Sequence, residues 1–151
     1  MTSTHLASVA WKRTTPDFDY ETYGRDHTIR FGSGSTIEAS SAPEYKGDAS
    51  RVNPEESLVA ALSSCHMLTF LAVAARAKLV VDAYDDDAVG YLEKNAEGRI
   101  AVTRVTLRPR IRFAGDVVID AERLAKLHEQ AHRACFVANS VKTVLTVESR
   151  E

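Results

Sequence analysis

The sequence predicts an α+β fold, and two observations carry that prediction. One long apolar segment with helical spacing lies between two groups of short segments with β-type alternation. A second amphipathic segment and a final alternating segment follow it. The predicted order is therefore strands, long helix, strands, helix, strand, which is typical of the α+β class. At 151 residues the chain is predicted to form a single domain, residues 1–151.

The long helix is predicted within Asn53–Val81. Asn53 can cap it, Pro54 suits its first position, and Glu56 lies where a capping box places an acidic residue. Apolar residues then recur at helical spacing, at Leu58, Ala61, Leu62, Cys65, Leu68 and Ala72. Because Met67–Ala75 is almost entirely apolar, we expect this helix to be buried on most of its circumference.

Short β-type segments precede the helix. Leu6–Arg13 is predicted as an edge strand, and His27–Phe31 and Thr36–Ser40 as two strands joined by the Gly-Ser-Gly-Ser sequence of residues 32–35. Ser41–Val52 contains a proline and a glycine, so it is predicted as a loop that leads into the helix.

Two longer β segments, Tyr84–Lys94 and Arg99–Phe113, are predicted after the helix. Alternation in the second segment predicts one wet and one dry face. The two alternating sets are Val102, Arg104, Thr106 and Arg108, and Thr103, Val105, Leu107 and Pro109. Pro109 itself predicts an edge position or a bulge, since proline cannot donate to a sheet ladder.

A second helix, Ala121–Ala134, is predicted to be capped by Asp120. Its predicted inner stripe consists of Leu124, Leu127, Ala131 and Ala134. The alternating segment Val141–Glu148 is predicted as the last strand.

Composition excludes some classes of function. The formal net charge is −2 and no long basic run occurs, so we expect no nucleic-acid partner. The first 13 residues lack the apolar core of a signal peptide, and Met67–Ala75 is shorter than a membrane span, so we expect a cytoplasmic protein without a membrane partner. In that compartment two cysteines indicate redox chemistry, metal binding or simple burial.

The surroundings of the two cysteines leave these alternatives open. His66 follows Cys65, while His128 and His132 precede Cys135 by seven and three positions, roughly on one helical face. Imidazole and thiolate groups in such a cluster could bind zinc, although no CxxC or HExxH motif is present. Free cysteines are also often buried residues that only fill space.

Several sequence blocks together resemble the OsmC/Ohr family, the osmotically induced and organic-hydroperoxide-resistance thiol peroxidases. Asn53-Pro54-Glu55-Glu56 followed by Cys65 is similar to the family's NPE…C helix, and Tyr23-Gly24-Arg25-Asp26 to the segment that carries its N-terminal active-site arginine. Ala131-His132-Arg133-Ala134-Cys135 resembles its second-cysteine block. Two features depart from the best-known branches: Phe136 stands where they have proline, and CHMLTF surrounds Cys65. The chain thus resembles a less studied OsmC-like branch.

The resemblance implies a mechanism and a set of site residues. Cys65 would attack an organic hydroperoxide as a thiolate, helped by the charge of Arg25, and Glu55 would hold Arg25 by a salt bridge. The Cys65 sulfenic acid would condense with Cys135 to a disulfide, which a dithiol reductant of lipoyl or thioredoxin type would reduce. The resemblance implies no cofactor or metal.

The resemblance also implies an intertwined homodimer with interface sites, and helix geometry favours this. In an unbroken helix, Glu55 and Cys65 lie about 15 Å apart along the axis and about 80° apart around it. We therefore expect either a break between them or a site assembled from two chains, and we favour an obligate dimer. Two alternatives to a peroxidase are a metal-binding protein using Cys65, His128, His132 and Cys135, and a stress-induced structural or small-molecule-binding dimer with inert buried thiols.

Overall fold

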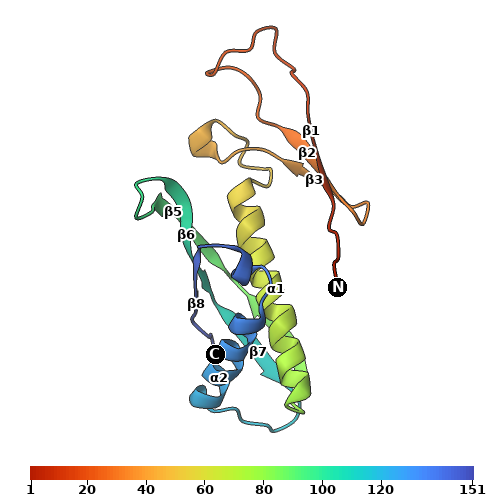
Figure 1. The fold of residues 1–151 in the computed structure, drawn as a ribbon, viewed down its shortest axis with the longest axis vertical. Coiled ribbons are helices and arrows are strands. Elements are labelled where there is room, and N and C mark those ends of the chain that lie inside the picture. The colour runs from red at the N-terminus through yellow and green to blue at the C-terminus, as the bar shows by residue number, and fades with distance from the viewer. The chain divides into compact units, whose positions relative to one another are not determined.

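The computed structural model describes all residues from Met1 to Glu151 in two compact units, Met1–Ser57 and Leu58–Glu151 (Figure 1). The order of elements is strands, long helix, strands, helix and strand, so the predicted α+β class is confirmed. The expectation of one domain over 1–151 stays a prediction.

The first unit contains a three-stranded antiparallel sheet of order β1-β2-β3. Its strands are β1 (Ala7–Trp11), β2 (His27–Phe31) and β3 (Thr36–Ala39), and the predicted hairpin joins β2 to β3. A short 3₁₀ helix, η1 (Pro43–Tyr45), interrupts the loop that follows. The three strand predictions are confirmed, with β1 at the edge of the sheet.

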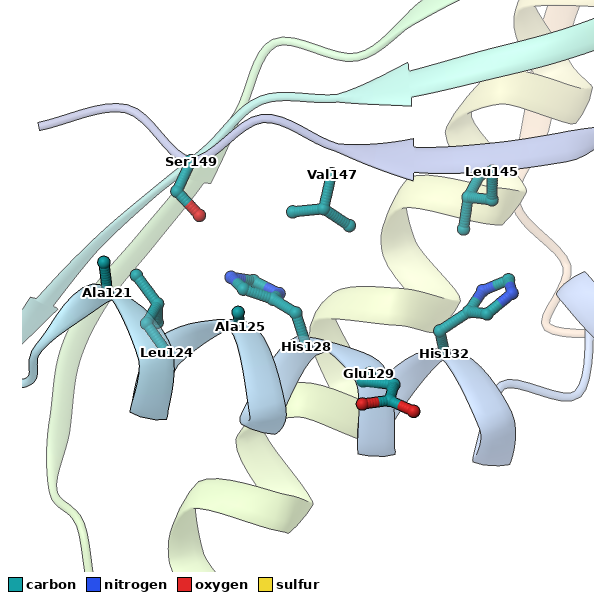
Figure 2. A pocket seen from close by; sticks show the side chains of 9 residues that line it. All are labelled: Ala121, Leu124, Ala125, His128, Glu129, His132, Leu145, Val147 and Ser149. Carbon is teal, nitrogen blue, oxygen red and sulfur yellow. The ribbon is translucent and has the colours of Figure 1, made fainter.

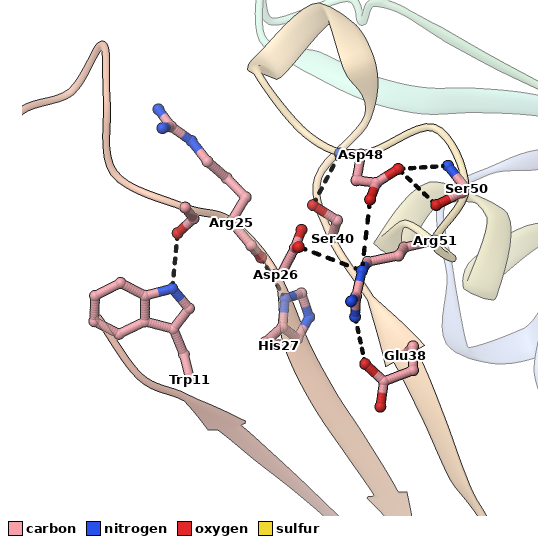
Figure 3. A network of polar contacts seen from close by, with 10 residues as sticks. Trp11, Arg25, Asp26, His27, Glu38, Ser40, Asp48, Ser50 and Arg51 are labelled. Atoms are coloured by element: carbon pink, nitrogen blue, oxygen red, sulfur yellow. Dashed lines mark hydrogen bonds and ion pairs between the residues drawn. The ribbon is translucent and has the colours of Figure 1, made fainter. Parts of the chain in front are cut away.

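Arg51 holds the loop after β3 in place through three carboxylates (Figure 3). Its guanidinium lies 3.3 Å from Asp26 and 3.6 Å from Asp48, and it also pairs with Glu38 on β3. Hydrogen bonds from the hydroxyl and the N–H of Ser50 lower the pKa of Asp48, which keeps that carboxylate ionised. This network fixes the chain directly before the long helix.

Helix α1 (Pro54–Arg76) is continuous over 23 residues. The predicted capping box forms: the Asn53 side chain accepts from the Glu56 N–H at 2.8 Å, and the Glu56 carboxylate accepts from the Asn53 N–H at 3.1 Å. By length and composition α1 could cross a membrane, but core helices of soluble proteins meet the same criterion, so this is weak evidence.

The prediction that α1 is buried on most of its circumference is wrong for the single chain. Its buried residues are Leu62, His66, Phe70 and Ala74, which form one narrow stripe with a spacing of four. Ala61 and Ala72, both expected inside, are exposed, and Leu68 is 60% exposed. The reason is that only one side of the helix packs against other elements of its own chain.

The second unit pairs its strands in two groups. β4 (Val81–Asp86) runs antiparallel to β7 (Pro109–Phe113). In the other group β6 (Ile100–Leu107) lies between antiparallel β5 (Val89–Lys94) and parallel β8 (Val144–Val147). Val105 and Leu107 are buried with Leu62 of α1, so one of the two alternating sets is dry as predicted. The other set is not uniformly wet, because Thr106 is only 6% exposed and Val102 packs against the same cluster.

The two long β segments predicted after α1 are each divided into two strands, which corrects the sequence prediction. The first divides at residues 87–88 and the second at Arg108. The carboxylate of Asp86 accepts a hydrogen bond from the Arg108 N–H at 2.6 Å and another from the Ser63 hydroxyl. Because that N–H is bound to a side chain, Arg108 marks a corner, and Pro109 begins β7 as its first residue.

Helix α2 (Ala121–Ala134) has the predicted bounds, and the Asp120 side chain accepts from the Arg123 N–H at 2.8 Å. Leu127 and Ala131 pack with Phe70 and Ala74 of α1, whereas Ala134, expected on the inner stripe, is exposed. A short 3₁₀ helix, η2 (Ala138–Ser140), precedes β8, which is shorter than the predicted Val141–Glu148.

Candidate active site

The structure brings Cys65 and Cys135 together, although 70 positions separate them in the sequence (135 − 65). Cys65 is half-buried in the middle of α1, and Cys135 is buried at the end of α2. Cys135 has extended backbone angles as the C-cap residue, so it lies just outside α2. Both thiols are free.

The pKa values of the two thiols are shifted in opposite directions. Burial raises the pKa of the Cys65 thiol, but the Val137 N–H, the Cys135 thiol and the Phe136 N–H lie against its sulfur, and together they bring the pKa below its usual value. The pKa of Cys135 is raised, first by burial and then by its contact with Cys65. Cys65 is therefore the more acidic thiol of the pair, and Cys135 keeps its proton more readily.

A short turn, residues 135–140, presents these donors. The turn is fixed from within by hydrogen bonds from the Asn139 N–H to the Cys135 carbonyl and from the Ser140 N–H to the Val137 carbonyl, both at 3.0 Å. No backbone carbonyl accepts the Phe136 N–H, which leaves it available for the Cys65 sulfur. The Thr69 hydroxyl donates to the carbonyl oxygen of Cys65 at 2.7 Å and steadies α1 beside the site.

Arg25 lies in the first unit, in the loop before β2. Its guanidinium donates to the carbonyl oxygens of Tyr20, at 2.6 Å, and Tyr23, and it stacks 3.6 Å from the centre of the Tyr23 ring. In Figure 3 its side chain points away from the Arg51 network. Glu55 is half-buried in the first turn of α1 and forms no ion pair with Arg25 in the single chain. The expected Arg25–Glu55 salt bridge is thus not made within one chain.

An aromatic cavity lies next to Arg25 within the first unit. It has a volume of about 310 Å³. Its walls are formed by Trp11, Phe18, Tyr23, Arg25, His27, Ser40, Ser41 and Pro54. The rings of Phe18 and Tyr23 lie 5.0 Å apart, and the Trp11 indole donates to the Gly24 carbonyl at 2.8 Å. The loop that carries Arg25 is therefore braced by aromatic packing.

Comparison with known proteins gives the family. The OsmC-like protein family matches residues 47–150. The chain belongs to the OsmC-like family. An OsmC-like protein of unknown function from Vibrio cholerae has a structure with a TM-score of 0.92 and 44% identity, over 99% of this chain and 100% of that one. No curated protein matches the sequence.

More distant structures share the OsmC-like fold. The organic hydroperoxide resistance protein OsmC of Legionella pneumophila is 18% identical with a TM-score of 0.72, over 99% of this chain and 96% of that one. The organic hydroperoxide resistance protein OhrB of Bacillus subtilis is 19% identical with a TM-score of 0.71, over 98% of each chain. At these identities the likeness shows the fold.

The metal-site alternative is not supported by the geometry of this OsmC-like chain. No group of three or more His, Cys, Asp or Glu side chains lies close enough to hold a metal ion. His128 instead turns its Nδ1 to the Nε2 of His66 at 3.0 Å, in a buried and stacked pair, while His132 is exposed.

Sequence reasoning missed the donors of the turn that follows Cys135. These donors are the backbone N–H groups of Phe136 and Val137, and a backbone donor leaves no side-chain motif in the sequence. The one available signal was Phe136 itself, because the proline found there in the best-known branches has no N–H to offer.

Proposed function

We propose that this chain is a thiol peroxidase that reduces organic hydroperoxides, with Cys65 as the attacking thiol and Cys135 as the resolving thiol. The observation that carries the proposal is the contact between two free thiols whose pKa values move in opposite directions. A thiolate is the nucleophile in such chemistry, and the more acidic partner is the one ready to attack. Fold similarity to organic hydroperoxide resistance proteins is consistent with this chemistry.

The proposed reaction proceeds in three steps. The Cys65 thiolate attacks the terminal oxygen of the hydroperoxide, the O–O bond breaks, and the alkoxide leaves as an alcohol after it takes a proton. The resulting Cys65 sulfenic acid is attacked by the sulfur of Cys135, which gives a disulfide and releases water. A dithiol reductant of lipoyl or thioredoxin type then returns both cysteines to thiols by exchange and becomes a disulfide itself.

Arg25 and Glu55 complete the proposed site from the partner subunit of a homodimer. Because α1 has no break, Glu55 remains about 15 Å along the helix from Cys65 of its own chain. The partner's copy is not bound by this restriction. The exposed Leu68 and the exposed alanines of α1 provide an apolar surface for a second chain. We propose that Glu55 releases Arg25 from the Tyr20 and Tyr23 carbonyls and aims its charge at the partner's sulfur.

Peroxide consumption by the purified, reduced protein tests the roles of the two thiols. Cys65→Ser should abolish consumption of an alkyl hydroperoxide while the fold is kept. Cys135→Ser should consume one equivalent, accumulate a sulfenic acid at Cys65 and then over-oxidise, because no second thiol traps it. Turnover by Cys65→Ser at the wild-type rate would overturn the assignment. Hydrogen peroxide measured in parallel shows whether the organic substrate is preferred.

Mixed dimers test whether the site is shared between chains. Arg25→Gln homodimers and Cys65→Ser homodimers should both be inactive. Exchanging subunits between them creates heterodimers in which Arg25 of one chain meets Cys65 of the other, so activity should return. If mixing restores nothing although heterodimers form, the two residues do not act across the interface.

The remaining parts of the proposal concern the setting of the protein. We propose a cytoplasmic enzyme that acts on a small peroxide and has neither a nucleic-acid nor a membrane partner, in line with its net charge of −2 and the absence of a long basic run. An active, stable monomer in size-exclusion chromatography with light scattering would contradict the shared site.

A further inference from the structure

A second cavity lies between α2 and β8, within the Leu58–Glu151 unit (Figure 2). Its volume is about 340 Å³, within the range in which small-molecule sites occur. Its walls are mostly apolar: Ala121, Leu124, Ala125, His128, Glu129, His132, Leu145, Val147 and Ser149. Neither cysteine lines it, so it is separate from the proposed peroxidase site.

One lining residue of the cavity carries a buried polar atom that has no hydrogen-bond partner. His128 is only 4% exposed, and Figure 2 shows its ring directed from α2 into the space between α2 and β8. Its Nδ1 is occupied by the hydrogen bond with His66, while its Nε2 is buried and bonded to nothing. A buried nitrogen without a partner is destabilising, so a ligand that supplies the missing bond would gain from it.

The imidazole pair is uncharged near neutral pH. Burial is the main cause that lowers the pKa of His128 to about 4, and the neighbouring His66 adds to the shift. A charged group would lose its water against this neutral nitrogen and the apolar walls, and the one carboxylate that lines the cavity, Glu129, is exposed and already paired with Arg133 at 3.6 Å. The occupant that fits is therefore neutral.

Hydrogen bonding narrows the ligand further. If His66 donates to Nδ1 of His128, then Nε2 of His128 carries a proton and donates; in the opposite tautomer Nε2 accepts. A hydroxyl group satisfies both cases, since it donates and accepts. We propose that the α2–β8 cavity binds a small uncharged molecule that has an apolar body and one hydroxyl group, bonded to Nε2 of His128. This proposal does not rest on the proposed peroxidase function.

Titration of the full-length protein with phenol, toluene and benzoate tests the proposal. Nitrogen-15 NMR of the histidine rings reports directly on Nε2. Phenol should shift the His128 Nε2 signal and bind with a dissociation constant on the order of 1 mM, as expected for so few atoms. Toluene, which has the same shape but no hydroxyl, should bind roughly 2- to 10-fold more weakly. Benzoate should not bind, since its charge would be buried.

Two variants and a control decide whether the binding is in this cavity. Ala125→Leu fills the cavity from an exposed helical position and should abolish phenol binding, whereas Gln130→Leu, on α2 outside the cavity, should leave it unchanged. His128→Phe should bind phenol and toluene equally. The proposal is overturned if phenol leaves the His128 signal unmoved. That result is expected if a second copy of the chain, rather than a small molecule, fills the cavity. Equal affinity for phenol and toluene in the wild type, or unaltered phenol binding by Ala125→Leu, would also overturn it.

Discussion

Replacement of Phe136 by proline should raise the pKa of Cys65 without disturbing the fold. The substitution removes one N–H that lies against the Cys65 sulfur, because proline has no backbone donor. The preceding residue is already suited to it: Cys135 has φ −74° and ψ 112°, close to the region that residues before proline adopt. The Phe136 side chain is 82% exposed, so its loss leaves no cavity.

The size of the effect follows from the number and kind of donors. A hydrogen bond to a charged group contributes about 1.5 to 3 kcal/mol. Cys65 is half-buried, and the Val137 N–H and the Cys135 thiol remain, so we expect the lower end of this range. A loss of about 1.4 kcal/mol reduces the thiolate population roughly tenfold at a pH below the pKa of Cys65.

The pH dependence of Cys65 alkylation by iodoacetamide measures that population. The thiolate is present above the pKa and is lost as the pH falls. Cys65 of Phe136→Pro should therefore react about tenfold more slowly than Cys65 of the wild type at low pH, and equally fast at a pH at which Cys65 is ionised in both proteins. Phe136→Ala removes the same side chain but keeps the N–H, and it should follow the wild type. If the proline and alanine variants give the same profile, the Phe136 N–H does not stabilise the thiolate.

Three further predictions concern stability, each measured by urea denaturation. Burial lowers the pKa of both His66 and His128 to about 4, below the unfolded value of 6.5. Because the folded state then binds fewer protons than the unfolded state, stability should be complete above pH 6.5 and be lost as the pH falls toward 4. The loss should be at most about 3 kcal/mol for each imidazole. His128→Phe should flatten this pH dependence, and an equally steep curve would contradict it. Gly90→Ala would place a Cβ 2.4 Å from a methyl group of Val59 and should lower the free energy of unfolding by about 1 to 3 kcal/mol. Val59→Ala in the same chain should recover part of this loss. If the losses of the two single variants simply add in the double variant, the clash is not the cause. Asn53→Ala should cost about 1 kcal/mol through the lost cap, while Asn53→Asp, which keeps the acceptor, should cost little; equal losses would show that the cap is not the cause.

The parts of the fold that could be predicted are those that local sequence determines. The starts of α1 and α2 follow from the side chains of Asn53, Glu56 and Asp120, which accept hydrogen bonds from backbone N–H groups close by in the sequence. The corner at Arg108 could not be predicted, because it depends on a hydrogen bond from the Arg108 N–H to a carboxylate on another strand.

The buried face of α1 could not be found from periodicity either. Met67–Ala75 is so uniformly apolar that no face differs from another in the sequence. In the folded chain the buried stripe of α1 is the one that contains His66, and its hydrogen-bond partner His128 lies 62 positions away in the sequence. Likewise, the nearness of Cys65 to Cys135 was expected from the family resemblance, since their spacing in the sequence alone left burial and metal binding open.

The position of Cys135 at the end of α2, rather than inside it, determines which part of the chain can move when the sulfurs bond. A disulfide requires the two Cα atoms to come within about 7 Å. Cys65 is held in the middle of α1 by helical hydrogen bonds on both sides, whereas Cys135 is bonded only through its N–H to the His132 carbonyl and through its carbonyl to Asn139. Oxidation should therefore adjust the turn of residues 135–140 and leave both helices intact. The exposed Phe136 ring on that turn would then report the redox state at the surface, where another molecule can distinguish the oxidised chain from the reduced one.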